Sequence, residues 1–134
     1  MILGIGTDMV LISQIRHFLG DETLSKAYRK HTFTPAENAA ALTRPDPERP
    51  EYYASRFAAK EAAYKALAHL LPEKQFDLRI IETLNIPDGC PYIPVTEQLR
   101  PVMDAAGVQV LHISITTEGD YACAFVIAEG HTSW

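Results

Sequence analysis

Hydrophobic residues recur along the chain at the spacings of strands and helices. Residues 2–9 are apolar, rich in β-branched side chains and carry two glycines, which is typical of a short buried strand. A helix is expected to follow over residues 11–19. Near the C-terminus, residues 108–116 and 121–128 have strand patterns on either side of the turn sequence at residues 117–120. The chain is therefore predicted to begin with a strand and to end with a hairpin.

The first strand of this hairpin has two faces of different character, because successive side chains of a strand point to opposite sides. Its apolar face is predicted to be core and consists of Leu111, Ile113 and Ile115. The other face is polar and consists of His112, Ser114 and Thr116. This polar row either binds a ligand or faces solvent, and solvent exposure is the commoner outcome.

Capping signals predict two short helices before the centre of the chain. Asp21 is a good N-cap for a helix over residues 21–30. Thr34 and Glu37 flank a proline in the pattern of a capping box, which starts another helix. Residues 44–50 form a loop that is too short to separate two domains.

A long helix is predicted over residues 51–70, which are rich in alanine and free of glycine and proline. Its apolar stripe consists of Tyr53, Phe57, Tyr64, Ala68 and Leu71. Glu61 falls inside this stripe, and a buried carboxylate is costly unless it is paired. The partner is either Lys65, one turn away, or a bound cation.

Two more strands are predicted over residues 78–84 and 92–95, joined by a turn at Asp88 and Gly89. A short helix is expected after them, with Pro101 near its start and Gly107 at its end.

Composition and charge narrow the class of protein. The 134 residues are 47% hydrophobic and 22% charged, which predicts one compact domain over residues 1–134 rather than a disordered chain. A formal net charge of −5 disfavours nonspecific nucleic-acid binding. No stretch approaches the roughly 20 apolar residues that span a membrane, so a cytoplasmic location is expected. Cys90 and Cys123 form no CxxC pair, so zinc has no support.

Asp8 and Glu61 are the best candidates for metal ligands, because one ends a strand and the other interrupts an apolar stripe. Mg²⁺ usually takes one or two protein carboxylates and completes its shell with water and phosphate oxygens. The alternatives are a helix cap at Asp8 and an ion pair at Glu61. Gly4 and Gly6 do not extend to a dinucleotide-binding motif, because position 9 is a methionine.

Three segments resemble the holo-acyl-carrier-protein synthases, which are small, trimeric, bacterial 4′-phosphopantetheinyl transferases. The segments are GIGTDMV at residues 4–10, RFAAKEAAYKAL at residues 56–67 and HISITTEGDYACAFVI at residues 112–127. The resemblance runs nearly end to end. It implies an α+β fold, in which a long helix packs on a small antiparallel sheet, and a homotrimer with active sites between subunits.

The resemblance also implies a role for each candidate residue. Asp8 and Glu61 correspond to the Mg²⁺ ligands of the family, and with Lys65 they form the implied catalytic set. The implied coenzyme A site consists of Arg56, Lys60, Lys65, Gly89, Pro91, His112, Ser114 and Thr116. From spacing alone, a solvated helix face is the commoner outcome for these lysines.

The implied reaction is attack by a serine hydroxyl of apo-acyl carrier protein on the β-phosphate of coenzyme A, in fatty-acid biosynthesis. The products are holo-acyl carrier protein and adenosine 3′,5′-bisphosphate. Mg²⁺ and the lysines would stabilise charge on the transferring phosphoryl group. Glu61, directly or through a water, is our candidate for the base.

The chain departs from the family pattern at several positions. Leu11 and Gln14 replace an acid and a basic residue on the first helix, Thr117 replaces a histidine, and Cys90 replaces a basic residue of the turn. Since carrier proteins are acidic, docking needs a basic patch. The residues available for it are Arg16, Lys26, Arg29 and Lys30, which otherwise form an ordinary solvated face.

Two other functions compete with transfer. A binding module could keep the fold and the coenzyme A or carrier surface while losing turnover, and a Mg²⁺-dependent nucleotide phosphohydrolase would share the metal chemistry. Retention of Asp8, Glu61 and Lys65 favours an active transferase, because buried acids are costly to keep without use. Residues 130–134 carry no functional signal and are expected to be disordered.

Overall fold

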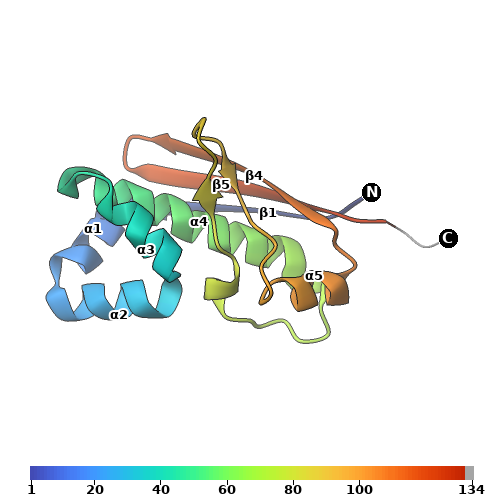
Figure 1. The fold of residues 1–134 in the computed structure, drawn as a ribbon. Helices are drawn as coiled ribbons and strands as arrows, with labels where there is room; N and C mark the ends of the chain where they lie inside the picture. Colours follow the sequence, from blue (N-terminus) through green and yellow to red (C-terminus); the bar gives the residue numbers. More distant parts are fainter. Residues whose placement is uncertain (132–134) are drawn as a thin grey trace.

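A computed structural model describes residues 1–131 of the chain. Three strands form one antiparallel sheet in the order β1 (Ile2–Leu11), β5 (Tyr121–Glu129) and β4 (Val110–Glu118). The long helix α4 (Arg49–Leu67) lies along one face of this sheet (Figure 1). The expected α+β fold is confirmed. Of residues 130–134, for which disorder was expected, residues 132–134 lie outside the described residues, whereas Gly130 is placed and its N–H donates to the Met1 carbonyl.

The remaining elements surround this helix and sheet. They are α1 (Ile12–Gly20), α2 (Glu22–Thr32), α3 (Pro35–Leu42), α5 (Arg100–Ala106), the strand pair β2 (Leu84–Asn85) and β3 (Pro91–Tyr92), and the 3₁₀ turns Asp46–Glu48, Ala68–Leu70 and Leu78–Ile80. The predicted caps are confirmed: Asp21 accepts a hydrogen bond from the Leu24 N–H, and Thr34 and Glu37 form a complete capping box. Within the described residues, no helix is both long enough and apolar enough to cross a membrane.

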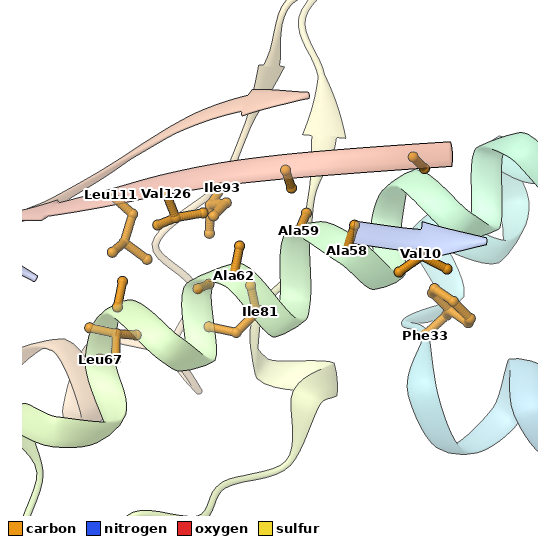
Figure 2. Packing of buried hydrophobic residues seen from close by; sticks show 14 of the residues in the cluster. Val10, Phe33, Ala58, Ala59, Ala62, Leu67, Ile81, Ile93, Leu111 and Val126 are labelled. Carbon is orange, nitrogen blue, oxygen red and sulfur yellow. The ribbon is translucent and has the colours of Figure 1, made fainter. Parts of the chain in front are cut away.

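The glycines near the N-terminus allow α4 to lie directly against β1. A Cβ atom at Gly6 would lie 2.0 Å from the Ala62 carbonyl oxygen, and one at Gly4 would lie 2.1 Å from the Ala66 carbonyl oxygen. The helix contributes a row of fully buried alanines to this contact, including Ala58, Ala59 and Ala62 (Figure 2). Small residues on both elements therefore set the close spacing that brings Asp8 and Glu61 together.

This close packing corrects the predicted buried face of α4. The alanines form the centre of the buried face, whereas Phe57, Glu61 and Tyr64 of the predicted stripe are only half-buried at its margin. The aromatic stripe was the stronger hydrophobic signal, but the close approach of α4 to β1 selects small side chains. Glu61 therefore reaches the edge of the helix–sheet interface, where a ligand can approach.

The predicted strand over residues 78–84 is wrong except at its last residue. Residues 78–80 form a 3₁₀ turn, and Leu84 and Asn85 alone pair with β3. The reason is a buried ion pair that reaches into this segment. The Lys60 ammonium donates to the carbonyls of Leu78 and Ile81, and a Glu37 carboxylate oxygen accepts from the Thr83 N–H. These backbone groups bind side chains instead of a strand ladder.

The sheet face opposite α4 has no covering element among the described residues. Its rows follow from the register: Ile5, Ile127 and His112 form one row, and Met9, Cys123 and Thr116 form another. Phe125 lies between these rows, beside Thr7 and Ser114. Ile5, Met9 and Phe125 are 60%, 63% and 43% exposed, so an apolar surface lies open at the centre of this face. We call this face the outer sheet face.

Candidate active site

Two carboxylates and one ammonium meet where α4 crosses β1. Asp8 lies on the sheet face that α4 covers, with its side chain 18% exposed. The Lys65 ammonium lies 3.1 Å from an Asp8 carboxylate oxygen and donates to the Thr7 carbonyl at 3.0 Å. Burial and the negative charge of Asp8 raise the pKa of Glu61, while Lys65 opposes this shift. Glu61 and Asp8 are therefore close enough to repel each other.

These two carboxylates fit a hard divalent cation. Among the described residues, no group of three or more His, Cys, Asp or Glu side chains could hold a metal ion. Mg²⁺ does not need three, since it usually binds through one or two carboxylates and retains water and phosphate ligands. A cation at Asp8 and Glu61 would remove the repulsion that raises the pKa of Glu61.

A mostly apolar cavity of about 410 Å³ opens beside the two acids. Leu11 and Gln14 line it from the β1–α1 junction, Tyr28 from α2 and Phe57 from α4. We call it the acid-site cavity. It places an apolar wall against the carboxylates and leaves one side open for a substrate.

A second cavity, of about 380 Å³, lies at the other edge of the sheet. Arg56 is its principal cation and is only 4% exposed. Its guanidinium donates to Ser55 at 3.1 Å and to Asn85, and it lies 4.6 Å from the centre of the Tyr52 ring. The Arg44 guanidinium lies 4.9 Å from the same ring. We call this the arginine cavity.

Arg56 has unused capacity to bind an anion. Among residues 1–131 it makes no ion pair, and its buried Nε has no hydrogen-bond partner. Burial lowers the pKa of Arg56, and the Tyr52 ring partly offsets this shift. A planar guanidinium with free donors at a cavity wall suits a phosphate group. Gly89 and Pro91 line the same cavity, so the structure brings three predicted coenzyme A residues together.

Thr117 and two acids complete the rim of this cavity. The Thr117 hydroxyl donates to a Glu51 carboxylate oxygen at 3.0 Å, which links the end of β4 to the start of α4. Glu48 also lines the cavity. Thr117 therefore affects the cavity by holding the Glu51 carboxylate in place, since it carries no charge of its own.

Lys60 is not brought to either cavity. It is fully buried, and its ammonium lies 2.7 Å from a Glu37 carboxylate oxygen and donates to two carbonyls. All three ammonium hydrogens are thereby occupied. Burial lowers the pKa of Lys60, and Glu37 opposes this shift. Lys60 therefore has no donor left for a ligand.

His112, Ser114 and Thr116 are not brought to these cavities either. They lie on the outer sheet face, whereas both cavities open on the face that α4 covers. His112 lies 2.9 Å from a Glu129 carboxylate oxygen. Within one chain, these three residues and the two acids therefore lie on opposite sides of the sheet.

Comparison with known proteins identifies the family. The family model described as "ACPS: 4′-phosphopantetheinyl transferase superfamily" matches residues 4–126. The chain belongs to this superfamily. It is 36% identical over 133 residues to the holo-[acyl-carrier-protein] synthase of Caulobacter vibrioides strain NA1000, covering 96% of each chain.

Solved structures of the same superfamily have the same fold. The holo-[acyl-carrier-protein] synthase of Neisseria meningitidis matches with a TM-score of 0.82 and 30% identity, over 96% of this chain and 99% of that one. A holo-(acyl-carrier-protein) synthase of Bacillus anthracis in complex with CoA (3′,5′-ADP) matches with a TM-score of 0.73 and 26% identity, over 98% and 99%.

Several residues that line these cavities carry no site signal that was recognised in the sequence, among them Tyr28, Arg44, Tyr52 and Asn85. Tyr52 directly precedes Tyr53 of the predicted stripe. It therefore lies outside the helix face that the stripe predicts to be buried, and nothing in the sequence assigned its ring to a site. Arg44 lies in the predicted loop, shortly before the tyrosines that begin the long helix. A cation close to aromatic residues is the signal that could have indicated its contact with Tyr52.

Proposed function

We propose that this superfamily member is a holo-acyl-carrier-protein synthase, which transfers the 4′-phosphopantetheine arm of coenzyme A to a serine of apo-acyl carrier protein. The observation that carries the proposal is the meeting of Asp8, Glu61 and Lys65 at the crossing of β1 and α4. The names of the relatives and the coenzyme A in the Bacillus anthracis structure support the same activity. The other product is adenosine 3′,5′-bisphosphate.

Asp8 and Glu61 are the proposed Mg²⁺ ligands. When bound, Mg²⁺ supplies Lewis-acid stabilisation of the pyrophosphate charge. Lys65 is held between Asp8 and the Thr7 carbonyl, and its ammonium adds positive charge beside the phosphates. Glu61 is our candidate for the base that takes the serine proton, directly or through a water, because its carboxylate lies beside the proposed phosphate position.

The arginine cavity is the proposed site for the phosphate-bearing nucleotide of coenzyme A. Arg56 offers a buried guanidinium that makes no ion pair among the described residues, and Gly89 and Pro91 line the same cavity. Arg44 is exposed and lies against Tyr52, so it can turn towards a second phosphate.

A homotrimer with active sites between subunits would join the two cavities. In one chain they share no lining residue, and β5 separates the β1 edge from the β4 edge. The apolar outer sheet face is a suitable subunit interface. Packing through that face would also bring His112, Ser114 and Thr116 next to another subunit. In the trimer these residues could then bind coenzyme A held by that subunit, which they cannot do in a single chain.

A groove between α1, α2 and the start of α4 is the proposed docking surface for the carrier. Arg16, Arg29 and Arg49 line it together with the exposed Leu42. Lys26 and Lys30 lie exposed on α2, which also supplies Tyr28 to the acid-site cavity. An acidic carrier bound here would present its serine towards Asp8 and Glu61.

We further propose a single domain over residues 1–134, a cytoplasmic location and a role in fatty-acid biosynthesis within lipid metabolism.

Intact-mass spectrometry of apo-acyl carrier protein incubated with this protein, coenzyme A and Mg²⁺ tests the proposed function. We expect a gain of one phosphopantetheine arm that is lost with Asp8→Ala and with Glu61→Ala. Calorimetric binding of coenzyme A without transfer would favour the binding module instead. Phosphate release from nucleotides in the absence of carrier would favour the phosphohydrolase.

A further inference from the structure

Tyr28 has a buried hydroxyl that the proposed mechanism does not use. Its ring lies among three aromatic residues, with ring centres 5.8 Å from Phe18, 5.1 Å from Phe33 and 5.9 Å from Phe57. The hydroxyl oxygen is closed to solvent and has no hydrogen-bond partner among the described residues. Nearly all buried hydroxyls in native proteins are hydrogen-bonded. This phenol therefore has a donor that its own chain leaves unused.

Glu61 supplies the matching acceptor. Its carboxylate and the Tyr28 ring line the same acid-site cavity. Among the described residues, the Glu61 carboxylate accepts no hydrogen bond, since the Lys65 ammonium donates to Asp8 and to the Thr7 carbonyl. Burial, followed by the charge of Glu61, raises the pKa of Tyr28, so the phenol keeps its proton at neutral pH. A buried hydroxyl without a partner and a carboxylate therefore belong to residues that line one cavity.

The other polar groups near Glu61 are less suited to orient it. Lys65 is engaged by Asp8 and by the Thr7 carbonyl. Gln14 lines the cavity from α1, but it is exposed and can bind water. Tyr28 differs from both because three neighbouring rings fix its orientation.

We propose that Tyr28 is a positioning residue for Glu61: its hydroxyl donates to a Glu61 carboxylate oxygen, directly or through one water. This bond orients the carboxylate towards Asp8 and leaves its second oxygen free. The inference rests on the proposed function, since it assigns a partner to one of the two proposed Mg²⁺ ligands. Groups that orient metal ligands typically change metal affinity or activity by about 10-fold to 100-fold when removed.

The Tyr28→Phe variant tests this inference, because it removes one oxygen and keeps the ring. With Mn²⁺ as the probe, we expect electron paramagnetic resonance to show binding about tenfold weaker or more in the presence of adenosine 3′,5′-bisphosphate. We expect kcat to fall similarly, KM for coenzyme A to stay the same, and the melting temperature to be unchanged or higher. Tyr64→Phe is the matched control, since its hydroxyl donates to the Lys74 carbonyl outside the cavity.

The outcomes separate the possible failures. If the wild-type chain and the Tyr28→Phe variant bind Mn²⁺ equally well, the role of Tyr28 is overturned and the proposed metal site is not. A lower melting temperature with unchanged Mn²⁺ affinity assigns Tyr28 to the core and also overturns it. A wild-type chain that binds no Mn²⁺ and transfers no arm overturns the proposed metal site together with this inference.

Discussion

Arg56 and Glu61 lie five residues apart on α4 and face different cavities on opposite flanks of that helix. Five residues of an α-helix correspond to a rotation of about 140°. The helix and the three strands beneath it therefore separate the Arg56 guanidinium from the two carboxylates in one chain. The proposed coenzyme A site therefore takes these two groups from two different chains.

The first prediction concerns the arginine cavity. Arg56→Lys keeps the charge but loses the planar fork that donates to Ser55 and Asn85. We expect affinity for adenosine 3′,5′-bisphosphate to fall by about tenfold to hundredfold, corresponding to one or two charge-assisted hydrogen bonds. Isothermal titration calorimetry measures it, with Arg100→Lys on the exposed surface of α5 as the control. Unchanged affinity for Arg56→Lys would remove this cavity from the coenzyme A site.

The second prediction concerns stability without metal. Folding raises the pKa of Glu61 above its ordinary value of 4.5. Between the pKa of the unfolded chain and that of the folded chain, the folded chain therefore binds more protons than the unfolded chain. Stability therefore falls as pH rises through this window and remains lower above it. Glu61→Gln removes this effect, so in a chelator at pH 7 we expect a higher melting temperature than wild type, with the difference shrinking below the ordinary pKa. A melting temperature that is no higher than wild type at pH 7 contradicts this, and the exposed Glu97→Gln is the control.

The third prediction concerns carrier recognition. Reversing two charges with Arg29→Glu and Lys30→Glu should raise KM for the acidic carrier by about tenfold or more and leave coenzyme A binding unchanged. The effect should weaken as salt increases, because exposed charges are screened. Lys74→Glu with Arg100→Glu gives the same net charge at exposed positions outside the groove. Equal KM values for the two double variants would defeat the docking proposal.

The fourth prediction concerns the outer sheet face. Phe125 lies at the centre of the outer sheet face and is 43% exposed. Phe125→Glu should therefore leave the fold of one chain intact and place a charge in the proposed interface. Sedimentation equilibrium should show a trimer for wild type and a monomer for this variant. Val95→Glu, at a residue 40% exposed in a loop, should remain a trimer. A trimeric Phe125→Glu protein would place the interface elsewhere.

The elements with local signals were predictable from the sequence. Asp21, Thr34 and Glu37 act on residues three positions away. The final hairpin is defined by its own alternation and by its turn at Gly119. The segment over residues 78–84 was not predictable, because Lys60 and Glu37 reach it from distant positions in the chain. Local pattern does not record such contacts.

The candidate site was predictable in part for a similar reason. Asp8 and Glu61 were conspicuous because each acid interrupts an apolar pattern, and the structure does bring them together. Lys60 shows no such conflict in the sequence, and only its burial against Glu37 reveals its structural role. Alternation correctly assigned His112 to the polar face of its strand, but it does not say what that face meets. Tyr28 had the appearance of an ordinary core aromatic.

The most direct test of the account is complementation between two inactive variants. Asp8→Ala and Arg56→Ala should each lose transfer alone, and mixing them with subunit exchange should restore activity at about a quarter of the sites, where each variant supplies the residue that the other lacks. Intact-mass spectrometry of the carrier measures transfer, and native mass spectrometry verifies mixed trimers. Recovery of activity would place Asp8 and Arg56 of neighbouring subunits in one site. Mixed trimers without any recovery would contradict the shared site.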